Sequence, residues 1–312
     1  MPDSLVGSSE AMSHLRNYIP KVARSDAHVL ITGATGTGKE RVAAAIHGTS
    51  PRRSQPFLCV NCAAIPDALF ESEFFGFEQG AFTGAHEAYQ GKLRIASGGT
   101  IFLDEIGEMT MSAQAKILRV LESREVFPLG GRRVSTVNVR FVAATNQDLE
   151  PLVAERKFRQ DLFYRLNVAR LHLPALKDRK EDIPDLLTHF LQQFNQRYQL
   201  RIEGATGELL DCLLSYEWPG NVRELRNLVE AVFIDPPDRW ISLDDLPDYF
   251  RRIFSRYRVD TLPERDRLVS ILEQTNWNKK KAAREMNWSR MTLYRKISKY
   301  RLSGPLAEEP EK

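Results

Sequence analysis

A glycine-rich segment that ends in a lysine is the stretch of this sequence best suited to phosphate chemistry. It consists of Gly33, Ala34, Thr35, Gly36, Thr37, Gly38, Lys39 and Glu40. Glycines let the backbone curl with its N–H groups pointing inward, and such a nest in front of a helix N-terminus attracts phosphate oxygens. Lys39 adds a positive charge for the β- and γ-phosphates of a nucleotide. The segment is therefore predicted to be a phosphate-binding P-loop rather than a turn that binds nothing.

The last position of this loop departs from the general pattern, and a pair of acids elsewhere can compensate. The general pattern has Ser or Thr there to hold Mg²⁺, whereas this chain has Glu40. The metal is expected to rely on Asp104, with Thr37 or water as a further ligand. Asp104 and Glu105 end an apolar run at 100–103, which indicates a buried strand whose carboxyl end reaches the site. Glu105 would then activate an attacking water; surface acids are the alternative.

A second apolar run also ends in polar residues. Residues 139–146 are predicted to form a buried strand that closes with Thr145 and Asn146. Either residue is placed to sense the γ-phosphate of a nucleotide. Alternatively, either residue caps the next helix, which is expected to start near Asp148.

Two arginines follow that strand. Arg159 and Arg165 are six positions apart, so they do not share one helical face. Solvent-exposed arginines are the ordinary interpretation of such positions. In an ATPase that works as a ring, arginines here would reach the nucleotide of the neighbouring subunit.

A loop between glycines carries two isolated aromatic residues. Glycines at both ends of the segment 76–86 free the backbone to project. Phe77 and Phe82 lack apolar neighbours at a regular spacing. The loop is expected either to tuck one aromatic side chain onto its own domain or to present it to a partner.

The elements around these residues predict an α/β domain with a parallel sheet, followed by helices. Past Arg179 the strands are expected to stop, and Pro219 is placed near the start of a helix, where its missing N–H costs little. The predicted helices of this part, which would form a lid, lie at 183–198, 208–216 and 219–233, with a further short helix at 242–254. A linker is expected near 255–263.

The last stretch of the chain carries a concentrated positive charge. Between Glu264 and Arg301 there are eleven basic and four acidic residues, a local net charge of +7, whereas the whole chain carries +3. Helices are expected at 279–286 and 290–300, with Ser289 able to cap the second. This pattern fits a helix-turn-helix that enters the major groove, with a solvated helical hairpin as the alternative. The predicted DNA contacts are Lys279, Lys280, Arg290, Thr292, Tyr294, Arg295 and Lys296.

Composition limits the remaining choices. The chain has 312 residues, of which 42% are hydrophobic, enough for one large domain and one or two small ones. Cys59, Cys62 and Cys212 make no disulfide framework, and a zinc site is less expected than small residues on or beside a strand. A signal peptide and a membrane-length apolar run are both missing from the sequence, so a cytoplasmic protein without a membrane partner is expected.

Together these motifs resemble those of the bacterial enhancer-binding proteins, the AAA+ activators of sigma-54 RNA polymerase, over roughly residues 6–301. The most specific element is the hexapeptide Gly80, Ala81, Phe82, Thr83, Gly84 and Ala85, which contacts sigma-54 in that family. Glu40 matches the family's own P-loop, and residues 96–105 match its second nucleotide-binding signature. The resemblance implies ATP and Mg²⁺ as cofactors. It also implies a P-loop AAA+ αβα sandwich, an all-α lid and a Fis-type helix-turn-helix.

The resemblance assigns roles to single residues as well. Asn61 is implied to hydrogen-bond Glu105 and to relay the nucleotide state to the hexapeptide. The other implied roles are a first sensor at Thr145 and Asn146, trans-acting arginine fingers at Arg159 and Arg165, and a second sensor at Arg223. The implied function is to bind enhancer-like DNA and to use ATP hydrolysis to convert a closed sigma-54 promoter complex into an open one.

The expected organisation follows from these assignments. The predicted parts are a nucleotide-binding subdomain at 1–174, a lid at 175–250, a linker at 251–263, a DNA-binding domain at 264–304 and a disordered tail at 305–312. Expected partners are sigma-54 holoenzyme, double-stranded upstream DNA and further copies of the chain, as dimers that assemble into a hexamer. Because the ATPase begins almost at Met1, the chain resembles short members controlled by a separate protein, or else a piece of a longer one.

Two other kinds of protein remain as alternatives. A chaperone-type ATPase with a target other than polymerase would lack the helix-turn-helix and the Phe-Thr pair of the glycine loop. A DNA-binding repressor that uses the nucleotide only as a switch would have a damaged catalytic acid, whereas Glu105 is intact.

Overall fold

The computed structural model describes residues 5–131, 133–261, 264–286 and 288–302, with the backbone alone over 255–261. The chain forms two compact units. The first comprises Met1–Gln196 with Glu217–Val229, and the second comprises Arg197–Tyr216 with Glu230–Lys312. Within the described ranges, the helices lack the length and hydrophobicity that crossing a bilayer requires.

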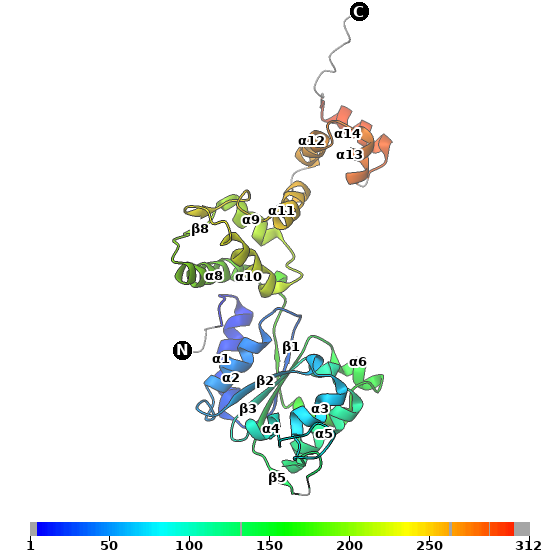
Figure 1. Ribbon diagram of the computed structural model, residues 1–312. Coiled ribbons are helices and arrows are strands. Elements are labelled where there is room, and N and C mark those ends of the chain that lie inside the picture. Colours follow the sequence, from blue (N-terminus) through cyan, green and yellow to red (C-terminus); the bar gives the residue numbers. More distant parts are fainter. Residues whose placement is uncertain (1–4, 132, 262–263, 287, 303–312) are drawn as a thin grey trace, which may run out of the picture. The chain divides into compact units, whose positions relative to one another are not determined.

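A five-stranded parallel sheet forms the centre of the first unit (Figure 1). In spatial order the strands are β2 (Phe57–Asn61), β3 (Thr100–Asp104), β6 (Arg140–Thr145), β1 (Val29–Thr32) and β7 (Ala169–His172). Because β6 lies between β3 and β1, the segments that follow these three strands emerge side by side. Ligands of open α/β sheets bind at this carboxyl edge.

Helices cover both faces of the sheet, since neighbouring side chains of each buried strand point to opposite faces. On one face, Val29 and Ile31 of β1 pack with α1 (Glu10–Arg24) and α2 (Lys39–Gly48). On the other face, Leu30 belongs to a core with five helices. These are α3 (Asp67–Phe75), α4 (Lys92–Ile95), α5 (Met111–Ser123), α6 (Leu149–Ala154) and α7 (Gln160–Leu166). The predicted αβα sandwich is confirmed (Figure 1).

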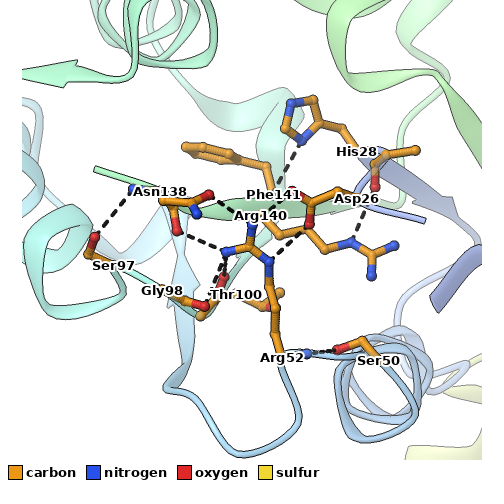
Figure 2. A network of polar contacts seen from close by, with 12 residues as sticks. Asp26, His28, Ser50, Arg52, Ser97, Gly98, Thr100, Asn138, Arg140 and Phe141 are labelled. Atoms are coloured by element: carbon orange, nitrogen blue, oxygen red, sulfur yellow. Dashed lines mark hydrogen bonds and ion pairs between the residues drawn. The ribbon is translucent and has the colours of Figure 1, made fainter. Parts of the chain in front are cut away.

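Two arginines stabilise the amino edge of the sheet, opposite the carboxyl ends. Arg140 is buried, and its guanidinium donates to the carbonyl oxygens of Val22 and Ala23 at the end of α1, at 2.8 and 3.1 Å. Arg52 pairs with Asp26 at 2.8 Å, which holds the pKa of that carboxyl below its usual value. Figure 2 shows Arg52 among the loops, where its guanidinium also bonds the carbonyl oxygens of Gly98, Gly99 and Asn138.

Short elements complete the first unit. They are the 3-10 helices η1 (Cys62–Ala64), η2 (Ile106–Glu108) and η3 (Leu176–Asp182), and the antiparallel pair β4 (Glu125–Val126) and β5 (Ser135–Thr136). Most of α8 (Ile183–Tyr198) and α10 (Asn221–Val232) also belongs here. The helix predicted at 219–233 begins at Asn221 and not at Pro219. Trp218 and Asn221 have positive φ angles of 49° and 53°, so Pro219 lies in a turn before the helix.

The second unit contains the remaining elements. They are α9 (Gly207–Ser215), α11 (Asp248–Thr261), α12 (Glu264–Gln274), α13 (Lys279–Glu285) and α14 (Arg290–Lys299), with the parallel pair β8 (Gly204–Ala205) and β9 (Trp240–Ile241). The expectation that strands stop past Arg179 is therefore wrong in this detail.

Helix α11 covers most of the predicted linker, because its backbone stays helical to Thr261. Within this helix, Phe254 is buried against Tyr216 with ring centroids 5.4 Å apart. Residues 262–263 of that linker and the tail at 305–312 lie outside the described residues.

The three terminal helices share a small core of their own. Leu268 and Leu272 of α12, Ala282 of α13 and Leu293 of α14 are all buried in it. Ser289 caps α14, as the sequence predicts, because its Oγ accepts the N–H of Thr292 at 3.0 Å. The helix-turn-helix fold is therefore confirmed.

Candidate functional site

A cavity of about 300 Å³ lies beside the glycine-rich loop at the carboxyl edge of the sheet. Its charged wall is formed by the loop backbone with Lys39, Asp104 and Glu105. Its apolar wall consists of Leu5, Val6, Met12, Leu173, Leu186 and Phe190. A pocket with one charged and one apolar end fits a nucleotide, which has a phosphate chain and a flat base.

Glycine is required at two positions of the loop for different reasons. Gly36 has φ +80°, and a Cβ there would stand 2.4 Å from the carbonyl oxygen of Gly220. Gly38 has φ +105°, although nothing lies within 4 Å of the position of a Cβ. Crowding therefore selects glycine at 36, whereas backbone conformation selects it at 38.

Lys39 is only 6% exposed and stands at the centre of the charged wall. Its Nζ donates to the carbonyl oxygen of Gly33 at 2.9 Å and lies 3.9 Å from Oε1 of Glu105. Burial lowers the pKa of Lys39, while the nearby carboxylates of Glu105 and Asp104 act to raise it. A cation withdrawn from water in this way gains strongly from an anionic ligand such as a phosphate.

Glu105 has a left-handed backbone with φ 52°. Such a conformation is uncommon for a residue other than glycine, and it is frequent at functional sites. Here it turns the chain at the end of β3, so that Oε2 of Glu105 accepts the N–H of Asn146 at 3.3 Å while Oε1 faces Lys39. Oδ1 of Asp104 accepts the N–H of Glu105 at 3.1 Å, which keeps both carboxylates at the cavity.

Asn146 and Thr145, the two candidate sensors, point in different directions. Nδ2 of Asn146 donates to Oγ1 of Thr35 in the loop at 3.0 Å. Thr145 is buried, and its Oγ1 accepts the N–H of Gln147 at 3.0 Å. Neither residue caps α6, because Asp148 does so. The geometry therefore places Asn146, and not Thr145, within reach of a ligand on the loop.

Two implied contacts take other forms in this structure. Oδ1 of Asn61 accepts the N–H of Ala63 at 2.9 Å, instead of the implied bond to Glu105. An Asn side chain at the end of a strand readily bonds the backbone two residues onward. Thr37, a proposed metal ligand, is buried, and its Oγ1 donates to the carbonyl oxygen of Ala34 at 2.8 Å.

A buried row of polar groups lies behind the loop, and it was not predicted from the sequence. Arg179 is 2% exposed, and its Nη2 donates to the carbonyl oxygen of Thr37 at 3.0 Å. Its Nη1 lies 3.6 Å from Oδ2 of Asp182, whose carboxylate accepts the N–H and the Oγ of Ser9 at 2.7 and 2.9 Å. These bonded polar groups therefore connect the loop to the start of α1. The i,i+3 spacing of Arg179 and Asp182 is the only local signal, and exposed helices show it too.

We expect Arg179→Met to raise the Kd for nucleotide roughly tenfold, or about 1.4 kcal/mol. The carbonyl oxygen of Thr37 and the carboxylate of Asp182 would both lose a buried charged donor. Titration of a fluorescent ATP analogue, well below the melting temperature, measures the effect. Arg170→Met is the matched control, because Arg170 pairs at the surface with Glu150 at 2.9 Å. An unchanged Kd for Arg179→Met would contradict the expectation.

The start of α10 holds the loop from another side. Nδ2 of Asn221 donates to the carbonyl oxygen of Thr35 at 2.9 Å, and the N–H of Arg223 donates to the carbonyl oxygen of Gly36 at 3.2 Å. The side chain of Arg223, the predicted second sensor, lines the cavity. Asn221 was missed, because its role depends on a positive φ and on a loop far away in the sequence.

Arg159 and Arg165 are absent from the described residues that line the cavity. Arg159 precedes α7 and pairs with Asp161 at 2.8 Å, and Arg165 is exposed on α7. In this structure, therefore, neither arginine borders the cavity of its own subunit.

The glycine-hinged loop presents one of its two aromatic residues. Phe82 is 48% exposed, whereas Phe77 is partly buried between Phe82 and Tyr89, with ring centroids 5.0 and 5.8 Å away. The segment between β4 and β5 supports this loop, because the carbonyl oxygen of Leu129 accepts the N–H of Glu78 at 3.0 Å. This support was not predicted, because it is a contact between two distant backbone segments.

The terminal helices divide the predicted DNA contacts into two groups. Arg290, Tyr294 and Arg295 are exposed on α14. Lys296 is only 19% exposed, and its Nζ pairs with both carboxylate oxygens of Glu264 at 2.5 and 2.8 Å. Lys296 therefore joins α14 to α12, and its charge is already paired.

Three family models match successive parts of the chain. A model described as the sigma-54 interaction domain matches residues 5–172. A model described as an AAA+ ATPase lid domain matches residues 177–259, and one described as bacterial regulatory protein, Fis family, matches residues 263–300.

Individual proteins match over almost the whole chain. The transcriptional regulatory protein ZraR of Salmonella typhimurium is 44% identical over 301 residues, which are 95% of this chain and 68% of ZraR. The DNA-binding transcriptional activator HyfR of Escherichia coli is 43% identical over 96% of this chain and 48% of its own length. A crystal structure of NtrX from Brucella abortus in complex with ATP aligns with a TM-score of 0.72 at 36% identity, over 96% of this chain and 69% of that one.

Proposed function

Because this chain belongs to the sigma-54 interaction domain family, we propose that this transcriptional activator hydrolyses ATP in a ring of subunits to open sigma-54 promoter complexes. The observation that carries the proposal is the split of the charged groups. Lys39 and Glu105 meet at one cavity, whereas Arg159 and Arg165 lie away from it. A site divided in this way would be completed by a neighbouring copy.

In the proposed reaction Glu105 orients a water molecule and takes its proton as the water attacks the γ-phosphate. Lys39 and the loop N–H groups hold the β- and γ-phosphates. Asn146 would lie beside these phosphates, because its Nδ2 bonds Oγ1 of Thr35 in the loop. The carboxylate oxygens of Asp104 are the kind of ligand that Mg²⁺ prefers, and Asp104 borders the same cavity. Mg²⁺, when bound, would neutralise charge on the phosphate oxygens.

The neighbouring subunit supplies Arg159 and Arg165 in this proposal. A guanidinium stabilises the charge that spreads over the transferring phosphoryl group. The arrangement fits a hexameric ring built from dimers, in which each cavity is completed by the next copy.

The proposed output is movement of the hexapeptide Gly80–Ala85. We infer that Asn61 exchanges its bond to the N–H of Ala63 for one to Glu105 in another nucleotide state. Phe82 and Thr83, both exposed, then engage sigma-54. The terminal domain holds the ring on enhancer-like upstream DNA, and these partners place the proposed work in the cytoplasm.

An open-complex assay with sigma-54 holoenzyme tests the proposal. We expect open complexes with ATP, and none with a non-hydrolysable analogue or with Glu105→Gln. ATP turnover without open complexes would indicate an ATPase with another target. Specific DNA binding without turnover would indicate a repressor that uses the nucleotide only as a switch.

For the terminal domain we expect Arg295→Ala to weaken binding to all DNA sequences and to reduce the slope of log K against log salt by about one. Arg295 is an exposed cation on α14, the helix expected in the major groove. Lys296→Ala is the comparison, because it breaks the pair with Glu264. We expect it to lower the melting temperature of the domain and to leave the salt slope nearly unchanged. Gel shifts across a salt series measure both. Equal salt slopes for Arg295→Ala and the unchanged chain would contradict the assignment.

A further inference from the structure

Gln114 of α5 is a buried amide that the proposed reaction does not use. Its side chain is 0% exposed, yet it makes hydrogen bonds to three backbone groups. Nε2 donates to the carbonyl oxygens of Met109 and Lys157 at 2.8 and 3.0 Å, and Oε1 accepts the N–H of Arg159 at 2.8 Å. Burying an amide is costly unless it is bonded, so its place in an otherwise apolar helix face reflects these three partners.

The partners of Gln114 belong to two different parts of the proposed reaction. Met109 directly follows η2, the turn that starts next to Glu105. This turn is tight, because the N–H of Glu108 donates to the carbonyl oxygen of Glu105 at 3.0 Å and that of Met109 to Ile106 at 3.3 Å. Arg159, in contrast, is one of the arginines assigned to the next subunit's nucleotide.

Both ends of Arg159 have hydrogen-bond partners. Oε1 of Gln114 holds its backbone N–H, and Asp161 holds its guanidinium at 3.0 and 2.8 Å. A displacement of the turn at 106–109 therefore acts through Gln114 on the backbone from which the Arg159 side chain projects. The path from Glu105 to Arg159 consists of adjacent hydrogen-bonded groups, without a gap filled only by apolar side chains.

We propose that Gln114 is a positioning residue that couples the state of a subunit's own Glu105 to the placement of Arg159 towards the next subunit's ATP. The inference rests on the proposed shared site. When Glu105 exchanges partners, the turn at 106–109 shifts, and Gln114 passes that shift to Arg159. Each cavity thereby governs the completion of its neighbour's cavity, which gives the ring a direction of communication.

Mixed assemblies test the proposal. Gln114→Met keeps the size of the side chain but removes all three bonds, and we expect it to lower ATP turnover about 100-fold, as misplacement of a catalytic group does. The Kd for a fluorescent ATP analogue should stay within about twofold, because Gln114 does not touch the cavity. The Gln114→Met chain is then mixed with Glu105→Gln, which cannot hydrolyse ATP but keeps its own Arg159. Where a Glu105→Gln subunit supplies Arg159 to the cavity of a Gln114→Met subunit, that cavity should regain turnover.

The same mixture made with Arg159→Ala separates this inference from the proposed function. If Arg159→Ala recovers turnover and Gln114→Met does not, the defect lies in the subunit's own cavity and the role of Gln114 is overturned. If Arg159→Ala itself fails to recover, the shared site is wrong, and this inference falls with it.

Two further variants control for stability. Ile117→Ala removes a fully buried side chain of the same helix that is not bonded to Arg159, and it should lower the melting temperature while leaving turnover nearly intact. Gln114→Glu keeps the shape and the acceptor for Arg159 but loses both donors, so it should also be rescued in the mixture if Gln114→Met fails to fold. Equal loss of turnover in Ile117→Ala would overturn the positioning role.

Discussion

Arg159→Ala and Arg165→Ala are each expected to lower ATP turnover by about three orders of magnitude. The Kd for nucleotide should stay within about twofold of the unchanged chain, since both side chains lie away from the cavity of their own subunit. The loss is large because a missing guanidinium leaves the spreading phosphoryl charge uncompensated in a site that excludes water.

Steady-state turnover against protein concentration measures this effect together with assembly. The unchanged chain should show a specific activity that rises with concentration as copies associate, whereas the two variants should stay low throughout. Lys157→Ala is the matched control, because Lys157 is an exposed cation in the same segment that pairs with Glu155 at 2.7 Å. Full activity in a preparation shown to be monomeric would contradict the shared site.

Thr83→Ala is expected to abolish open-complex formation while ATP turnover stays within about twofold. Thr83 is exposed beside Phe82 in a loop that does not line the cavity, so its loss removes contact chemistry without disturbing hydrolysis. The side chain is small, and the turn around it is closed by the N–H of Gly80 donating to the carbonyl oxygen of Ala85 at 2.9 Å, which the substitution leaves in place.

Parallel assays of turnover and of open complexes on one promoter separate the two activities. Glu87→Ala serves as the control, because Glu87 is exposed close to the hexapeptide but outside it. Normal open-complex formation by Thr83→Ala would remove the hexapeptide from the proposed contact with sigma-54. A parallel loss of ATP turnover would instead show that the loop and the cavity are not separable.

The sheet and the charged wall could be predicted from the sequence, because their signals are local. Apolar runs ending in polar residues mark β3 and β6, and the spacing from Gly33 to Lys39 marks the loop between β1 and α2. Parallel strands bring such ends to one edge, so Asp104 and Glu105 were expected near the loop without knowledge of the strand order.

The support of the site could not be predicted, because its bonds join residues far apart in the sequence through backbone atoms. Asp182 bonds Ser9, and Gln114 bonds Arg159; neither pair leaves a pattern in either segment. A carbonyl oxygen or an N–H group is present at nearly every residue, so sequence alone cannot tell which one a buried Gln or Arg will choose.

The predicted boundaries of two helices were wrong for a related reason. The break before α10 depends on the positive φ angles of Trp218 and Asn221. These angles could not be predicted from the presence of Pro219 between them. Most of the expected linker is helical, and Phe254 within it is buried against Tyr216, a contact between distant residues that local composition does not reveal.

The amino edge of the sheet has a mechanical consequence. Arg140 joins β6 to the end of α1, and Arg52 joins Asp26 to the loops that enter β3 and β6. These cross-links give that edge a low compliance, so elastic bending of the sheet would absorb little of the work released by hydrolysis. In the proposed reaction, the anchored edge would then serve as the fixed end, and we expect the displacement at the carboxyl edge, where the segments after β2 and β3 begin.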